Sequence, residues 1–145
     1  MGVRTYDFKK YKLIIGGVPI QGFADGTGIN LERAEDLFTK VVGADGKTSR
    51  SKSNDLSGRL TITLKQTSPS NDYLSSIAQL DETTNVGIVP MILKDFNGTT
   101  VATSSALWNV KKPGVELAKE LTNREWIFDC ADLQLTVGSN LALPV

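Results

Sequence analysis

The sequence predicts a mostly β protein with two packed antiparallel sheets, a sandwich or partly open barrel, and one flanking α-helix. Three observations support this fold class. Apolar and polar residues alternate strictly in "RLTITLK", residues 59–65, as in a strand with one wet face. Glycine-containing turn signals divide several other apolar runs, and one segment shows helical spacing. With 145 residues, the chain 1–145 has the size of a single domain.

The first element is a short hairpin in "YKLIIGGVPIQGF", residues 11–23. Its two strands meet at Gly16-Gly17, a two-residue turn suited to positive φ angles. The sequence therefore predicts that the chain begins its ordered part in a sheet.

Residues 29–42, "INLERAEDLFTKVV", fit two interpretations. Asn30 could cap a helix, and five apolar residues follow helical spacing, which slightly favours a helix by pattern alone. However, the segment runs into an Asp45-Gly46 turn and then a Ser-, Thr- and Lys-rich extended stretch. That context favours the outgoing strand of a long hairpin.

The clearest helix is expected over about residues 69–80. Ser68 is placed to cap it and Pro69 to occupy its first position. Leu74, Ile77 and Ala78 form one apolar stripe, which predicts that the helix covers a face or an end of the sheet.

The remaining elements are strands. Asn97-Gly98 predicts a hairpin over residues 87–110, whose second strand is rich in hydroxyl side chains. A loop follows, in which residues 115–121 could form a helical turn. In the last strand, residues 124–137, the apolar phase changes near Ala131-Asp132, and this change predicts a bulge.

A nucleotide site is excluded by spacing. "VVGADGKTSRSK", residues 41–52, has a Gly-Lys pair, but the position five residues before it, where a phosphate-binding loop has its first glycine, is Val41. Asp45-Gly46 is better explained as a hairpin turn. Asp25-Gly26-Thr27-Gly28 lacks the further acidic ligands of a calcium loop and predicts a glycine-rich turn.

Catalysis is also disfavoured. The chain contains no histidine and a single cysteine, Cys130, which lies among apolar residues and is expected in the core. These absences exclude the common histidine-dependent nucleophiles and most zinc sites. The sequence therefore predicts no enzyme, with no catalytic, cofactor-binding or metal-binding residues and no cofactor.

The charge is balanced overall but unevenly distributed. Residues 1–65 carry eleven basic and seven acidic side chains, whereas residues 66–145 carry five basic and nine acidic ones, so the halves are +4 and −4. A net charge of zero gives no reason to expect tight nucleic-acid binding. The asymmetry could average out over the surface, or it could serve head-to-tail self-association.

Several short motifs occur in an order that resembles the tail tube proteins of contractile-tailed bacteriophages. They are Gly-Phe-Ala-Asp-Gly at 22–26, Arg-x-Glu-Asp-x-Phe-Thr at 33–39, Gly-Ala-Asp-Gly at 43–46, Ser-Gly before the strand at 57–64, and Gln-Thr-Ser-Pro-Ser-Asn at 66–71. The resemblance covers about residues 8–137 and depends on the order of these motifs.

The resemblance implies a structural virion protein, similar also to the tube protein of the type VI secretion system. Six copies would close into a ring, and rings would stack into a hollow tube through which DNA passes during ejection. Residues 29–53 would form a long hairpin arm that reaches neighbouring subunits. The implied partners are further copies of the chain, the tail sheath protein, a baseplate or tube initiator and the tape-measure protein. The implied location is the virion tail, with assembly in the host cytoplasm.

The resemblance places Asp45 and Gly46 at the turn of the arm tip. Lys47, Arg50 and Lys52 follow, and we expect them to meet carboxylates of an adjacent ring. The competing interpretation is that they form a solvated charged surface, which is at least as common for any single lysine or arginine.

The candidate lumen wall consists of Thr99, Thr103 and Ser105. Hydroxyl groups bind water but do not hold DNA phosphates through charge, so DNA could slide past them. An ordinary outer strand is the alternative. Trp108 and Trp126 are expected in the core or at a subunit interface.

Two other functions remain open at this stage. One is a secretion-type tube of bacterial origin, and the other is a small β-sandwich module with a ligand in an end pocket, which predicts a monomer. We expect no membrane span, since no apolar run reaches about eighteen residues, and the first residues lack the apolar core of a signal peptide.

Overall fold

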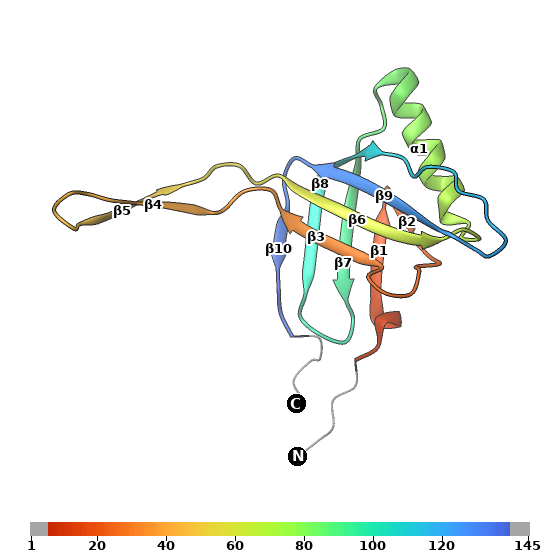
Figure 1. Cartoon of the computed structure of the whole chain (residues 1–145), viewed down its shortest axis with the longest axis horizontal. Helices are drawn as coiled ribbons and strands as arrows, with labels where there is room; N and C mark the ends of the chain where they lie inside the picture. The colour runs from red at the N-terminus through yellow and green to blue at the C-terminus, as the bar shows by residue number, and fades with distance from the viewer. Residues whose placement is uncertain (1–5, 140–145) are drawn as a thin grey trace, which may run out of the picture.

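The computed structural model describes residues 6–139 (Figure 1). A short 3₁₀ turn, Phe8–Lys10, comes first. The strands are β1 Tyr11–Ile15, β2 Val18–Pro19, β3 Ile29–Arg33, β4 Phe38–Val42, β5 Thr48–Lys52, β6 Gly58–Lys65, β7 Val89–Asp95, β8 Val101–Lys111, β9 Asn123–Cys130 and β10 Gln134–Thr136, and the helix is α1 Ser70–Thr84. The mostly β fold with one helix is confirmed within this part of the chain.

Eight of these strands form one antiparallel sheet, in the order β2-β1-β7-β8-β9-β6-β3, with β10 also paired to β8. The long strand β8 connects two layers. Its first half lies between β7 and β10, whereas its second half pairs with β9. Figure 1 shows β1, β7, β8 and β10 running across β3, β6 and β9. The two expected packed layers are therefore halves of one continuous sheet, and the second sheet is the separate pair β4-β5.

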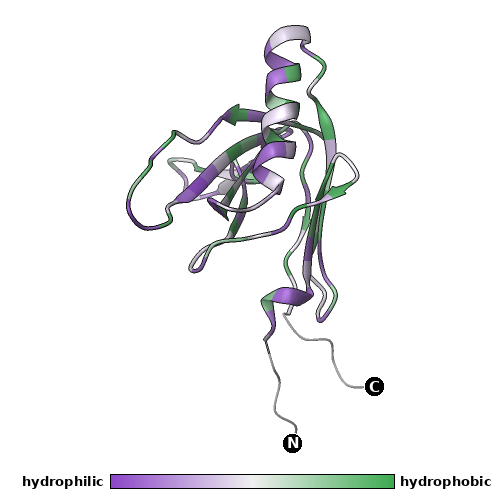
Figure 2. Ribbon diagram, turned by 90° about the vertical axis from the view of Figure 1, so that its right-hand side faces the viewer, coloured by the Kyte–Doolittle hydropathy of each residue, from purple (hydrophilic) through white to green (hydrophobic). Residues whose placement is uncertain are grey.

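The core lies between the two layers. Strand β6 alternates as the sequence predicts, with Leu60, Ile62 and Leu64 fully buried. Trp126 and Phe128 on β9 belong to the same cluster of buried side chains. Cys130, also in this cluster, has no exposed surface, and burial raises the pKa of its thiol. Hydrophobic and hydrophilic residues alternate along the strands in Figure 2.

The layers do not close into a barrel. Strand β3 ends the sheet order on one side, and β10 borders β8 at another edge. Side chains of both edge strands, including Ile29, Leu31 and Leu135, line a pocket of about 320 Å³ together with Tyr11 and Leu93. The opening of the partly open barrel therefore lies between β3 and β10.

Helix α1 begins one residue later and ends four residues later than the expected 69–80, and Pro69 precedes its first residue. Pro69 occupies the N-cap position that was predicted for Ser68. The Ser68 hydroxyl accepts a hydrogen bond from the Ser70 backbone N–H and donates one to the Gln21 carbonyl, so it connects the start of the helix to the neighbouring loop. Leu74 and Ala78 are buried against the core, as the apolar stripe predicts. The helix ends at Asn85, which adopts the left-handed conformation.

Residues 29–42 form two strands separated by a bend at residues 34–37, so the helical interpretation of this segment is wrong. The segment is also not one arm strand. Residues Ile29–Arg33 pair with β6 in the main sheet, and the arm is the separate hairpin β4-β5, which extends away from the body (Figure 1). The start of the predicted arm at residue 29 is therefore too early by about one strand.

Three connections complete the fold. The hairpin between β7 and β8 forms as expected, but five residues separate its strands, and Asp95 N–H donates to the Thr100 carbonyl. Residues 112–122 contain no helix, so the helical turn expected at 115–121 is absent. The single last strand predicted over residues 124–137 is instead two strands, and the expected bulge at Ala131-Asp132 is a break between β9 and β10, where the chain passes from one layer to the other.

Candidate functional site

The β4-β5 hairpin is the most distinctive surface of the molecule. Each residue from 34 to 52 is exposed. The tip is closed by hydrogen bonds from Gly43 N–H to the Lys47 carbonyl and from Gly46 N–H to the Gly43 carbonyl. Gly46 has a φ of 82°, which is the positive value expected for its turn. Asp45 supports the turn by accepting a hydrogen bond from the Lys47 backbone N–H at 3.1 Å.

The strand register gives the hairpin two chemically different faces, because alternate residues of a strand point to opposite sides. Lys40 lies directly opposite Arg50, Phe38 opposite Lys52, and Val42 opposite Thr48. We call these six residues the basic face. The Arg50 guanidinium lies 4.0 Å from the centre of the Phe38 ring on this face. The other side, the neutral face, consists of Thr39, Val41, Ser49 and Ser51.

The structure brings together two of the three predicted arm cations. Arg50 and Lys52 share the basic face, and Lys47 lies at the tip. Lys40, a fourth cation of the arm, was not among the residues predicted from the sequence. A two-residue Asp45-Gly46 turn would place Lys40 opposite Ser51, whereas the observed register places it opposite Arg50.

The base of the arm carries the opposite charge. Glu35, Asp36 and Asp55 are exposed where the chain enters and leaves the hairpin. The Asp55 carboxylate accepts a hydrogen bond from the Ser57 backbone N–H at 2.9 Å, and hydrogen bonding to Ser57 lowers the pKa of Asp55. We call these three residues the acidic base.

A hollow of about 560 Å³ lies next to the acidic base. It is lined by the ion pair of Arg59 Nε with Asp129 Oδ1, at 2.9 Å, and by Trp108 and Arg33. Arg33 donates through Nη2 to the Leu133 carbonyl at 2.7 Å. This bond connects the end of β3 to the segment just before β10, so the arm leaves the body at a braced corner.

The hydroxyl-rich strand β8 has Ala102 and Ser104 buried and Thr103 and Ser105 on its outer side. Thr103 lies between Ile92 of β7 and Gln134 of β10. Thr103 and Ser105 thus share the outer side of β8, whereas Thr99 is exposed in the turn that precedes the strand.

Two of the three predicted wall hydroxyls are engaged within the chain. Ser105 Oγ donates to Asp132 Oδ2 at 2.6 Å, and Ser104 Oγ donates to Asp132 Oδ1 at 3.0 Å. These hydrogen bonds, first from Ser105 and then from Ser104, lower the pKa of Asp132. Thr99 Oγ accepts a hydrogen bond from the Ser139 backbone N–H.

The two tryptophans occupy different environments. Trp126 is only 1% exposed, which confirms its place in the core, and its indole N–H donates to Asn71. Trp108 is half-buried beside the arm base.

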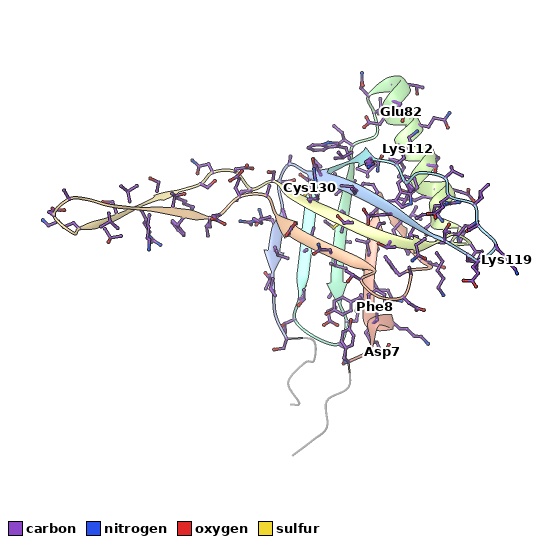
Figure 3. All side chains as sticks on the ribbon, in the orientation of Figure 1. Asp7, Phe8, Glu82, Lys112, Lys119 and Cys130 are labelled. Carbon is purple, nitrogen blue, oxygen red and sulfur yellow. The ribbon has the colours of Figure 1, made fainter. Side chains whose placement is uncertain are left out.

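Around the helix, Lys112 and Glu82 form an ion pair of 2.6 Å and lie beside each other in Figure 3. Among residues 6–139, no group of three or more acidic or cysteine side chains is placed to hold a metal ion. In the same part of the chain, helix α1 lacks the length and the apolar character that a membrane crossing requires.

Solved structures share this fold. The anti-feeding prophage cap, which terminates the AFP tube, superposes with a TM-score of 0.63 at 9% identity and covers 94% of each chain. The sheath/tube terminator of the extracellular contractile injection system PVC gives 0.59 at 12% identity, over 93% of this chain and 99% of the other. A chain of the PVC sheath-tube complex gives 0.58 at 12% identity, over 91% of both.

Sequence comparison gives a more specific result. "Structural protein ORF10" of Pseudomonas phage KPP10 is 28% identical over 123 residues, which span 83% of this chain and 71% of that protein. The family model described as "Bacteriophage PhiTE tail tube protein" matches residues 15–138. This match includes the arm, the helix and every strand from β2 to β10. The chain therefore belongs to the PhiTE tail tube protein family of bacteriophages.

Proposed function

We propose that this tail tube protein is a structural, non-catalytic subunit that forms hexameric rings, and that the rings stack into a hollow inner tube within a contractile sheath. DNA would pass through this tube during ejection. The exposed arm is the observation that carries the proposal, because an isolated monomer would leave the apolar side chains of the arm in water, far from the core.

The arm exposes apolar side chains far from the core. Val41 is 62% exposed and Val42 56%, in a two-stranded hairpin that extends away from the body. A lone hairpin of this size is only marginally stable in water, and clustered exposed apolar residues commonly mark an interaction surface. A neighbouring subunit that covers the arm would both stabilise the hairpin and bury its apolar side chains. In this arrangement Asp45 and Gly46 shape the tip, and Lys47, Arg50 and Lys52 reach an adjacent ring.

The open sheet edges support the same conclusion. Edge strands present unpaired backbone groups that invite another strand. Here β3 and β10 border the opening of the body, close to the pocket that they both line. In a closed ring each edge meets the next subunit, so the ring completes the sheet that one chain leaves open.

We propose that the lumen wall is formed by Thr103 and Ser105 on the outer side of β8 and by Thr99 in the turn before this strand. It presents hydroxyl groups, and two of the three are already hydrogen-bonded within the chain. Hydroxyl groups bind water but, unlike lysine and arginine side chains, do not hold DNA phosphates through charge. DNA can therefore slide along such a surface. The proposed partners are the sheath protein outside, the tape-measure protein inside and a baseplate initiator at one end. The proposed location is the virion tail, after assembly in the host cytoplasm.

The test is negative-stain electron microscopy of the purified protein combined with its mass in solution, alone and after addition of baseplate components from the same particle. Six-fold rings or hollow tubes support the proposal. A compact monomer under both conditions contradicts it and supports a β-sandwich binding module, for which the pocket between β3 and β10 is the candidate site. A secretion-type tube would form the same rings but carry protein rather than DNA, so the cargo of native particles separates these two.

A further inference from the structure

We propose that the basic face of the arm of one copy docks on the acidic base of the arm of a second copy. This inference depends on the proposed self-assembly and goes beyond it by naming the two surfaces that meet. The contact is head-to-tail, since the two surfaces are different parts of the chain.

The basic face is unfavourable by itself. Lys40 and Arg50 are direct cross-strand partners, and like charges in this position destabilise a hairpin. Lys52 adds a third cation on the same face, which contains no acidic residue. Within residues 6–139, the ion pairs found join Arg59 to Asp129 and Lys112 to Glu82, so the cations of the basic face have no carboxylate partner. A surface with this repulsion is stabilised by an anionic partner.

The acidic base has complementary properties. Glu35, Asp36 and Asp55 are exposed and take part in neither of these two ion pairs. Asp55 is held by its hydrogen bond from Ser57, which keeps the carboxylate in place on the surface. Three carboxylates therefore stand on a braced corner of the body, matching in number the three cations of the basic face.

Apolar contacts favour a protein partner over nucleic acid. Phe38 and Val42 are interleaved with the cations and are 39% and 56% exposed. A phosphate backbone would leave these side chains in water, whereas a second copy offers Leu37, 44% exposed, beside its acidic base. The second copy thus matches both the charge and the apolar part of the basic face.

The contact repeats without symmetry about a two-fold axis. Each copy uses its basic face toward one neighbour and its acidic base toward the other, so the same displacement adds copy after copy. Such an interface generates rings or helical stacks, which are the assemblies proposed for this protein. The neutral face remains free for a different neighbour.

Charge reversal tests the proposal. One variant carries Lys40→Glu with Arg50→Glu, and a second carries Glu35→Lys with Asp36→Lys. Each alone is expected to raise the protein concentration needed for assembly at least about tenfold. An equimolar mixture is expected to recover assembly, because each variant then meets a complementary neighbour. Circular dichroism checks the fold, which should be unchanged since all four side chains are exposed.

The matched control places Ser49→Glu and Ser51→Glu on the neutral face of the same hairpin. It is expected to leave the basic-face contact intact, so it should assemble more readily than the Lys40→Glu, Arg50→Glu variant. Equal loss of assembly in both would overturn the proposal, because it would show that only the total charge of the arm matters.

The remaining outcomes separate this inference from the proposed function. Normal assembly of the Lys40→Glu, Arg50→Glu variant, while the unaltered protein forms tubes, overturns the docking contact and leaves the tube function standing. If that variant also loses binding to a fluorescent DNA duplex, the basic face is a nucleic-acid surface instead. Failure of the mixture to recover assembly likewise overturns the pairing. Absence of assembly by the unaltered protein contradicts the proposed function itself.

Discussion

The indole N–H of Trp126 donates a hydrogen bond to the side-chain oxygen of Asn71 across 3.0 Å, joining the centre of β9 to the first turn of α1. Asn71 also donates through its side-chain nitrogen to the Lys65 carbonyl at the end of β6. The Asn71 side-chain amide thus accepts from the buried indole N–H and donates to the last carbonyl of β6. These two hydrogen bonds hold the helix against the sheet.

Replacing this amide should destabilise the body. Asn71→Ala leaves the buried Trp126 N–H without its acceptor, which typically costs about 1–3 kcal/mol. The free energy of unfolding, from urea titrations followed by tryptophan fluorescence, is expected to fall by this amount. Ser75→Ala, an exposed change on the same helix, should alter it by less than about 0.5 kcal/mol. Equal values for both variants would show that the hydrogen bond contributes nothing measurable.

A side chain at position 58 is predicted to lower the stability of the fold. A Cβ at this position would lie 2.8 Å from the Glu32 carbonyl oxygen and 2.6 Å from a Leu133 methyl carbon. Gly58→Ala should therefore force β3 or the β10 segment to shift, at a cost of about 1–3 kcal/mol. Gly114→Ala is the control, because a Cβ there meets nothing within 4 Å. Thermal unfolding of the two variants gives the comparison, and similar melting temperatures would contradict the close approach.

Asp132 should contribute stability that depends on pH. Its folded-state pKa is lowered by the Ser105 and Ser104 hydrogen bonds, so its contribution is present above the ordinary aspartate pKa and is lost as the pH falls through the lower folded value. Asp132→Asn should thus be less stable than the unaltered protein at pH 7, and the difference should shrink in acid. Urea unfolding measured from pH 7 down to about pH 3 tests this. A difference that stays constant over this range would exclude the carboxylate as its source.

The lumen assignment gives a functional prediction. Thr103→Lys places a cation on the outer side of β8 between Ile92 and Gln134. If this surface faces DNA, the added charge should slow DNA release from particles without preventing tube formation. Ser75→Lys on the exposed side of α1 is the matched control and should release DNA at the normal rate. Equal release rates would place β8 away from the lumen.

Much of the body could be predicted because its strands alternate and its turns are marked by glycine. Leu60, Ile62 and Leu64 face inward as expected, and the phase change at Ala131-Asp132 marks a departure from a regular strand, although it is a break between two strands and not the bulge that was predicted. These features are local, so a sequence pattern is sufficient to reveal them.

The arm shows where a pattern is insufficient. The helical spacing across residues 29–42 combines two unrelated strands, since Leu31 belongs to β3 in the main sheet and Val41 to the separate hairpin. The break at residues 34–37 is not marked by glycine or proline. Likewise, the opposition of Lys40 and Arg50 depends on strand register, which only the paired structure fixes.

The arm supplies none of the buried hydrophobic residues of the body. If the arm makes the proposed contacts, substitutions on either face of the hairpin would change which neighbours a subunit accepts and leave the folding of the rest of the chain unaffected. In the proposed assembly, partner choice and folding would therefore depend on different residues. A lineage could replace its arm to exclude the subunits of a competitor in the same host cell and still retain the same sandwich.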